Sequence, residues 1–446
     1  MIQLTATIPK ILLMRINYFL FALLISGIAN AQELFTLEDA VGIALQNNYA
    51  IRIAKNTQEI SANNVSLGNA GFLPNVNAGL TQSNGINNTD QNFLDGRVVS
   101  QDGAKSHTLN ADASLDWTIF DGLLMFTSYD QLKKLREVGV LNTRANIEAT
   151  IAQVSLAYYD VVQLSQSIKA IQEALLVSRE RVNFINDKYL LGSASRADLL
   201  QAQVDMNEDS SLLLTQQQEL AVAKIALNEL LARDVMTEFS VIDTIIIDTA
   251  LNFGQIREVS LSSNSQLLIN KTYQQIAALE LKSLRSQRFP QIGVNLSYNY
   301  LKNTNEAGFV QSNQSYGLTY GVSARINIFD GLNLNRQIQN ARISIDNNRL
   351  LTEQFQLSLE SSIASSYKTY QNILAQVALE TSNVDIASQT LEFAREKYRV
   401  GSMTNLELRE IQLNYLNAQN RLISARYRAK LSEIGLLQLS GTIVKN

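Results

Sequence analysis

The fold is decided by residues 288–300, which read RFPQIGVNLSYNY. Pro290 closes a helix-like segment here, because proline cannot continue a helix but suits the first residue of a strand. From Ile292 onward, apolar and polar residues alternate strictly. The arrangement occurs a second time at residues 72–76, which read FLPNV and also lead into an alternating run. We therefore predict that the chain passes from helix to strand twice, at Pro74 and at Pro290.

The alternating runs have the pattern of membrane strands. Residues 316–328 carry Tyr, Leu, Val, Ala or Ile at every second position, with small or polar residues between them, and residues 109–119 behave alike. Period two over about ten residues is typical of transmembrane barrel strands, whose aromatic residues gather at the membrane interfaces. The alternative is a soluble antiparallel sheet with one face on a core.

Four such strands per chain cannot form a closed barrel. An open sheet edge is not tolerated in hydrocarbon, because its backbone groups find no partner there. Membrane strands would therefore have to be completed by further copies of the chain. A dimer or a trimer would meet this requirement, and the trimer would enclose the wider lumen.

Long stretches of the sequence are duplicated. IFDG at 119–122 recurs at 328–331, and KYLLGS at 188–193 recurs as KYRVGS at 397–402. Because long repeats are stronger evidence than single motifs, we predict two similar halves. Each consists of an amphipathic helix (roughly 36–70 and 253–287), two strands and a long helical hairpin. The predicted segments are a first repeat at 32–232, a linker at 233–252, a second repeat at 253–440 and a C-terminal tail at 441–446.

The hairpins are predicted to be unusually long. A continuous helix from just after the IFDG motif to Tyr189 would measure about 100 Å at 1.5 Å per residue. Its apolar residues, including Ile151, Val154 and Tyr158, recur near the 3.5-residue spacing of coiled coils. Attached to membrane strands, such helices would extend a channel through the aqueous space. A solid helical bundle or filament is the alternative.

The remaining composition excludes several functions. Lys10 and Arg15 precede a short apolar run and the small-residue motif Ala29-Asn30-Ala31, so residues 1–31 are predicted to be a signal peptide. The chain has no cysteine and one histidine, His107, which we predict to lie in a surface loop. No nucleotide-binding or hydrolase motif is present. We therefore predict no enzyme activity, no cofactor and no metal site, and a net charge of −4 gives no indication of nucleic-acid binding.

In this order, and repeated twice, the motifs resemble those of the TolC-like outer-membrane efflux proteins. The resemblance covers about residues 36–440 and includes the Pro-led strand pairs, the Phe-Asp-Gly motifs and two Tyr-x-x-Gly turns. It implies an α+β membrane protein that forms a homotrimer, with a 12-stranded β-barrel in the outer membrane and a long α-barrel in the periplasm. It further implies a passive exit duct of a tripartite efflux or type I secretion system, with a periplasmic adaptor protein and an inner-membrane pump as partners.

The resemblance also assigns roles to the two turns. In that family the Tyr-x-x-Gly turns are the periplasmic tips, where the tube narrows and the adaptor binds. By similarity, the adaptor-docking residues are Tyr189, Gly192, Ser193, Gly401, Ser402 and Thr404. The implied gate residues are Glu407, Glu410, Asp198 and Tyr398. Met403 stands where some members carry a basic residue of the closing contact, which argues against a salt-bridge form of the gate in this chain.

Two interpretations of the acidic tip residues remain open. Three copies of Glu407 and Glu410 around a narrow axis would concentrate cations, and their repulsion would raise some of their pKa values. Alternatively, Thr404-x-x-Glu407 and Ser195-x-x-Asp198 are capping boxes, and Glu410 belongs to a solvated helix face. The two roles are compatible for Glu407.

Two other functions compete with the exit duct. A non-conducting trimeric surface or adhesive stalk would use the polar segment 84–107 as a binding loop. A porin-like uptake channel is a weaker alternative, because long helices serve no purpose there. Helices that flank each strand pair and return to the same side favour the conduit.

Overall fold

The computed structural model describes residues 34–444, which form two compact units. The hairpin unit contains residues 34–48, 151–250 and 368–435. The sheet unit contains residues 49–150, 251–367 and 436–444. Two helices of 67 residues each, α4 (Leu124–Leu190) and α8 (Asn333–Arg399), contribute to both units. The predicted signal peptide, residues 1–31, lies outside the described residues.

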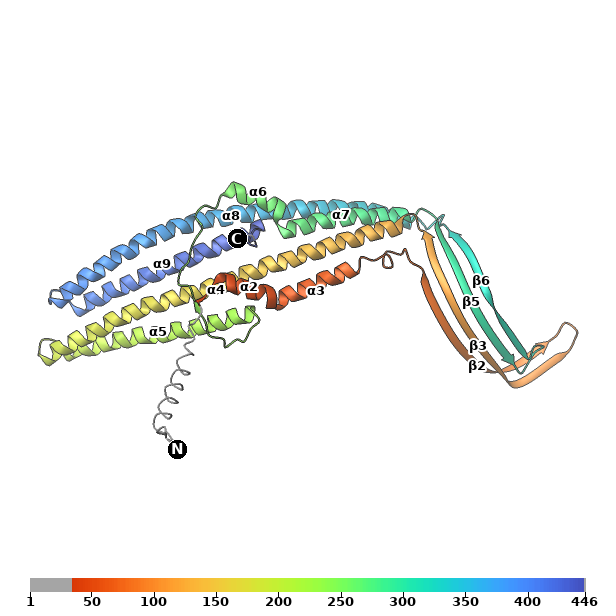
Figure 1. The fold of residues 1–446 in the computed structure, drawn as a ribbon, viewed down its shortest axis with the longest axis horizontal. Helices are drawn as coiled ribbons and strands as arrows, with labels where there is room; N and C mark the ends of the chain where they lie inside the picture. The colour runs from red at the N-terminus through yellow and green to blue at the C-terminus, as the bar shows by residue number, and fades with distance from the viewer. Residues whose placement is uncertain (1–33, 445–446) are drawn as a thin grey trace, which may run out of the picture. The chain divides into compact units, whose positions relative to one another are not determined.

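The sheet unit contains a four-stranded antiparallel sheet in the order β2-β3-β5-β6 (Figure 1). Each half of the chain supplies one hairpin, and the two hairpins join where β3 pairs with β5. The predicted four strands are therefore confirmed, with β2 and β6 as the two edges. The bounds are β2 (Asn75–Asn92), β3 (Val98–Phe120), β5 (Gln291–Asn305) and β6 (Ser312–Arg325).

The apolar positions of this sheet are not covered by a core of the same chain. Along β6, Tyr316, Leu318, Tyr320 and Val322 are 68%, 58%, 78% and 74% exposed. A soluble sheet would bury one such face, because leaving large apolar side chains in water forgoes about 1.5–3 kcal/mol each. The soluble-sheet alternative is thus disfavoured by the structure of the single chain.

The polar segment 84–107 is mostly strand, so its prediction as a loop was wrong. β2 continues to Asn92 and β3 begins at Val98, which leaves only a five-residue turn at 93–97. His107 therefore lies in β3, where it pairs with Asn84, and its Nδ1 is 2.7 Å from Asn84 Oδ1. Ladder hydrogen bonds join backbone groups, so polar side chains do not end a strand whose partner continues.

The helix that opens each half is broken once, at an asparagine. Asn48 and Asn264 have ψ angles of 128° and 117°, which are not helical. Asn48 Nδ2 donates to Leu230 O at 2.8 Å, and Asn264 Nδ2 donates to Leu439 O at 3.0 Å. The single helices predicted at 36–70 and 253–287 are therefore wrong, because each asparagine side chain satisfies a distant carbonyl in place of continuing its helix. The segments are α2 (Leu37–Asn47), α3 (Tyr49–Asn63), α6 (Phe253–Ser263) and α7 (Ser265–Ser286).

The duplicated Phe-Asp-Gly motif starts each long helix. Asp121 Oδ2 accepts a hydrogen bond from Met125 N at 2.9 Å, and Asp330 Oδ2 accepts one from Leu334 N at 2.7 Å. A carboxylate at this place satisfies a free amide of the first turn and favours the positive end of the helix dipole. The motif therefore marks the change from strand to helix in both halves.

The long helices end in hairpins, as predicted. α5 (Arg196–Leu230) returns along α4, and α9 (Asn405–Ser440) returns along α8 (Figure 1). In the linker, β4 (Ser240–Val241) pairs in parallel with β1 (Leu34–Phe35). Of the helices within residues 34–444, none is long and apolar enough to cross a membrane.

Candidate functional site at the hairpin turns

The two hairpin turns have the same backbone construction. Gly192 and Gly401 have φ angles of 73° and 81°, a region that glycine enters without steric cost. The following serines close the turn: Ser193 N donates to Lys188 O at 2.8 Å, and Ser402 N donates to Lys397 O at 2.9 Å. Each serine hydroxyl also donates to the same carbonyl. This six-to-one closure is a Schellman helix stop, which explains why KYLLGS and KYRVGS recur.

The turns expose large apolar side chains. Leu191 is 83% exposed in the first turn, and Val400 and Leu406 are 76% and 75% exposed in the second. The expected docking residues Gly192, Ser193, Gly401, Ser402 and Thr404 are exposed as well, and Tyr189 is 39% exposed. Exposed apolar groups concentrated on a small surface commonly mark sites of protein interaction.

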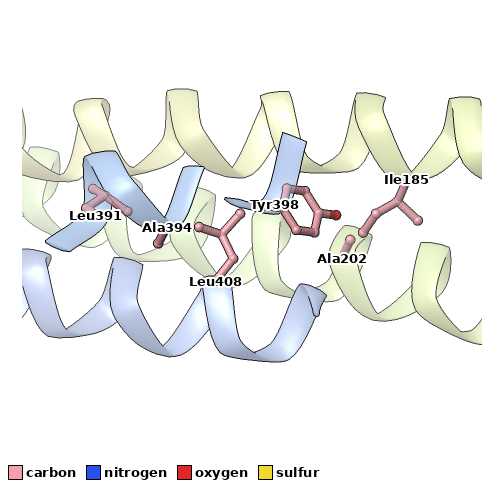
Figure 2. Packing of buried hydrophobic residues seen from close by; sticks show 6 residues of the cluster. All are labelled: Ile185, Ala202, Leu391, Ala394, Tyr398 and Leu408. Carbon is pink, nitrogen blue, oxygen red and sulfur yellow. The ribbon is translucent and has the colours of Figure 1, made fainter. Parts of the chain in front are cut away.

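Tyr398, unlike its counterpart Tyr189, is buried. Figure 2 shows it in a cluster with Ile185, Ala202, Leu391, Ala394 and Leu408, and Met403 packs against this cluster. Its ring lies 4.9 Å from that of Phe184, and Lys188 Nζ lies 4.5 Å from the Phe184 ring centre. Burial raises the pKa of Tyr398; the charge of Arg181 opposes this and that of Asp198 adds to it. Tyr398 thus links both hairpins through apolar packing.

Asp198 and Glu407 cap their helices. Ser195 Oγ accepts from Asp198 N at 3.1 Å, while Ser195 N donates to Asp198 Oδ2 at 3.2 Å. Thr404 and Glu407 form the corresponding pair, in which Thr404 N donates to Glu407 Oε2 at 2.8 Å. Hydrogen bonds from Ser195 lower the pKa of Asp198, and those from Thr404 lower the pKa of Glu407. Within one chain, this effect opposes the expected rise from mutual repulsion.

Glu410 is exposed and makes no hydrogen bond or ion pair in the described part of the chain. Across residues 34–444, no hydrogen bond or ion pair joins any two of the four expected gate residues, Asp198, Tyr398, Glu407 and Glu410. The structure of a single chain therefore places one of them in a core and three on the surface.

A buried polar network lies further from the turns. Arg409 donates to both carboxylate oxygens of Asp209, at 2.8 and 2.9 Å, and Arg181 Nη2 donates to Asp205 Oδ2 at 2.7 Å. Ser178 Oγ donates to Asp209, and Gln412 Nε2 donates to Ser178 Oγ at 2.8 Å. The network joins α4, α5 and α9. Because buried ion pairs are costly to break, it ties these three helices together.

This network was missed in the sequence, where none of its residues was given a role. Charged side chains are rarely buried, so a solvated helix face is the usual expectation for them. One signal was available: Ser178 and Arg181 are three residues apart and Asp205 and Asp209 four apart, so that each pair shares a helix face. No group of three or more acidic or histidine side chains able to hold a metal occurs in residues 34–444.

Comparison with known proteins agrees with this architecture. The model of the family described as outer membrane efflux protein matches residues 40–233 and 257–442. The outer membrane efflux protein BepC of Brucella suis is 21% identical over 412 residues, which cover 91% of this chain and 85% of that protein. The outer membrane protein TolC of Vibrio cholerae is 21% identical over 397 residues, covering 85% and 84%.

Solved structures share the fold. The outer membrane channel CmeC of Campylobacter jejuni superposes with a TM-score of 0.74 at 16% identity, covering 91% of this chain and 85% of that one. The open state of the Neisseria gonorrhoeae channel MtrE gives a TM-score of 0.66 at 16% identity, covering 91% and 89%. The channel lies in the outer membrane, has a periplasmic helical domain and is a non-enzymatic exit channel of a tripartite efflux or type I secretion system. The chain therefore belongs to the outer membrane efflux protein family.

Proposed function

We propose that this channel is a homotrimer whose three sheets close into one twelve-stranded barrel. The sheet of one chain leaves β2 and β6 as edges, and edges are not stable in hydrocarbon. Three copies of four strands satisfy both edges and give an even strand count, as bacterial barrels have. The exposed apolar positions of β6 then face lipid.

We further propose that the hairpin turns are the gate and that Glu407 and Glu410 give it its cation dependence. Three copies of each around an axis form a carboxylate-lined constriction, which attracts cations and repels anions. Capping leaves Glu407 free for this role, since both bonds from Thr404 reach Oε2 and none in the described chain reaches Oε1. The other two proposed gate residues are Asp198, which caps α5 in the first hairpin, and Tyr398, which packs in the buried cluster at the end of α8.

The same turns are our proposed docking surface for a periplasmic adaptor, which connects the duct to an inner-membrane pump. The exposed apolar side chains Leu191, Val400 and Leu406 support this assignment, because nothing in the described chain covers them. Tyr189, Gly192, Ser193, Gly401, Ser402 and Thr404 form the turns that present these side chains.

Single-channel conductance in planar bilayers tests the gate. We expect divalent cations added on the periplasmic side to block the channel, and expect Glu407→Gln with Glu410→Gln to weaken that block at least tenfold. Glutamine at this position keeps the capping box, so the double variant removes charge and preserves the turn. Asp346→Asn with Glu353→Gln is the matched control, because it removes the same charge from two exposed surface ion pairs, both made with Arg349.

Three results would count against the proposal. Equal block of wild type and the double variant would restrict both glutamates to capping and solvation. An absence of any conductance, even in the double variant, would favour a stalk. A native mass corresponding to one or two chains would contradict the trimer.

A further inference from the structure

The outward face of the sheet changes its chemistry between two neighbouring rows of cross-strand residues. Side chains that pair in register point to the same face of a sheet, so each row can be followed from β2 to β6. One row continues the exposed apolar positions of β6 and contains Leu80, Ala111, Tyr300 and Tyr316. The next two rows on this face contain Gln82, Leu109, Lys302 and Gln314, and then Asn84, His107, Thr304 and Ser312. We call the polar members of these two rows, other than His107, the donor band.

The donor band lies at the height of the outer membrane interface. β2 follows α3 and β5 follows α7, and the helical domain is periplasmic, so both strands run toward the outer leaflet. Lys302 is ten residues beyond Ile292, the first outward apolar residue of β5. At about 3.3 Å per residue and a tilt of about 40°, ten residues rise about 25 Å, which is the height of the apolar band of bacterial barrels. Tyr300 and Tyr316, one row below Lys302, occupy the position of an aromatic girdle.

Lys302 brings a positive charge to this band without a counter-charge. Its side chain is exposed, and it makes no hydrogen bond or ion pair within residues 34–444. Neither of the two rows contains a carboxylate. Glu306 lies four residues further out, about 13 Å along the strand direction, where its Oε2 accepts a hydrogen bond from Lys105 N at 3.0 Å. The ammonium group of Lys302 is therefore accessible to an anion from outside the chain.

We propose that, in the twelve-stranded barrel proposed above, Lys302 and the donor band hold the phosphate group of an anionic lipid of the outer leaflet. A phosphate carries the opposite charge, and hydrogen bonds between charged partners are roughly twice as strong as neutral ones. The hydroxyl and amide groups of the band donate further hydrogen bonds to its oxygens. The lysine stem lies along the apolar surface while its charged end reaches the headgroup. The acyl chains of the same lipid lie against the apolar rows below, so one molecule matches both surfaces.

Native mass spectrometry of the purified protein tests this site, because one spectrum reports both the number of chains and the lipids that they retain. The protein is incubated with lipid A, a phosphorylated glycolipid, and separately with the same lipid after enzymatic removal of its phosphates. We expect the trimer to retain the phosphorylated form at least threefold more. Lys302→Gln should abolish this preference, and Lys302→Arg, which keeps the charge, should preserve it. Lys282→Gln, which removes an exposed lysine of α7, is the matched control and should leave the preference unchanged.

The same spectra separate failure of this site from failure of the barrel. Trimers that retain both lipids equally would overturn the lipid site alone, since a lysine that reaches only water does not select phosphate. Equal loss of the preference in Lys302→Gln and Lys282→Gln would also overturn it, because the effect would then follow the total charge of the protein. Masses of one or two chains would refute the barrel and, with it, this site.

Discussion

Replacing Asp209 by leucine should strongly destabilise the hairpin unit. Asp209 accepts two hydrogen bonds from Arg409, at 2.8 and 2.9 Å, and its side chain is 3% exposed. Without it, Arg409, itself 7% exposed, keeps only a bond of 3.3 Å to Glu208. Breaking a buried pair by removing one partner costs about 3–5 kcal/mol, because an uncompensated charge remains buried.

The loss converts into a measurable shift in unfolding temperature. In a domain of 150–250 residues, each kcal/mol corresponds to roughly 2–4 °C, so we expect a fall of roughly 6–20 °C for Asp209→Leu. Circular dichroism at one fixed scan rate measures it, since unfolding of large membrane proteins is often irreversible and depends on scan rate.

A double variant tests whether the unpaired charge of Arg409 causes the loss of stability. Asp209→Leu with Arg409→Met replaces the pair by apolar groups, which is often neutral or stabilising, so it should recover most of the lost temperature. Asp346→Leu removes an exposed partner of Arg349 and should cost no more than about 1 kcal/mol. A double variant no more stable than Asp209→Leu alone, or a single variant as stable as Asp346→Leu, would refute the buried-charge explanation.

Three further predictions concern the turns. Gly122→Ala should reduce the yield of folded protein far more than Gly331→Ala. Both glycines have φ near 70°, but only at Gly122 would an added Cβ lie 2.3 Å from a backbone oxygen, that of Ser286. Equal yields of the two variants would contradict this explanation. Hydrogen bonds lower the pKa of Glu407 below its ordinary value of 4.5, so its cap is fully formed above pH 4.5 and is lost as the pH falls through the lowered pKa. Hydrogen exchange should therefore show that the protection of amides at the start of α9 falls only in acid. Glu407→Gln should remove this acid dependence. Gly401→Val should impair crosslinking to an adaptor more than membrane insertion, since it strains an exposed turn at φ 81° and leaves the strands intact; equal loss of both, measured by membrane fractionation, would contradict a tip location.

Periodicity and duplication were sufficient to predict the main elements. Strict alternation after Pro74 and Pro290 predicted the strands, which begin at the next residue in each case, Asn75 and Gln291. The coiled-coil spacing in α4 predicted its buried seam, in which Ile151, Val154 and Tyr158 are all buried. These signals are local, because each depends on side-chain spacing along a single element.

The errors came from contacts that are distant in sequence. Asn48 breaks its helix to reach Leu230, and no local pattern identifies that carbonyl. His107 lies in a strand because Asn84 continues opposite it. Arg409 is buried because Asp209, two hundred residues earlier, provides its partner. In each case the deciding group is known only once the chain has folded.

The equal lengths of the helices constrain how this protein can evolve. α4 and α8 each have 67 residues, and α5 and α9 have 35 and 36. A seven-residue insertion in α4 and α5 alone would extend that hairpin by about 10 Å and leave its turn out of step with the other. Adapting the duct to a wider periplasm would thus require four coordinated insertions, so gain or loss of length in one half should be found only with the same change in the other.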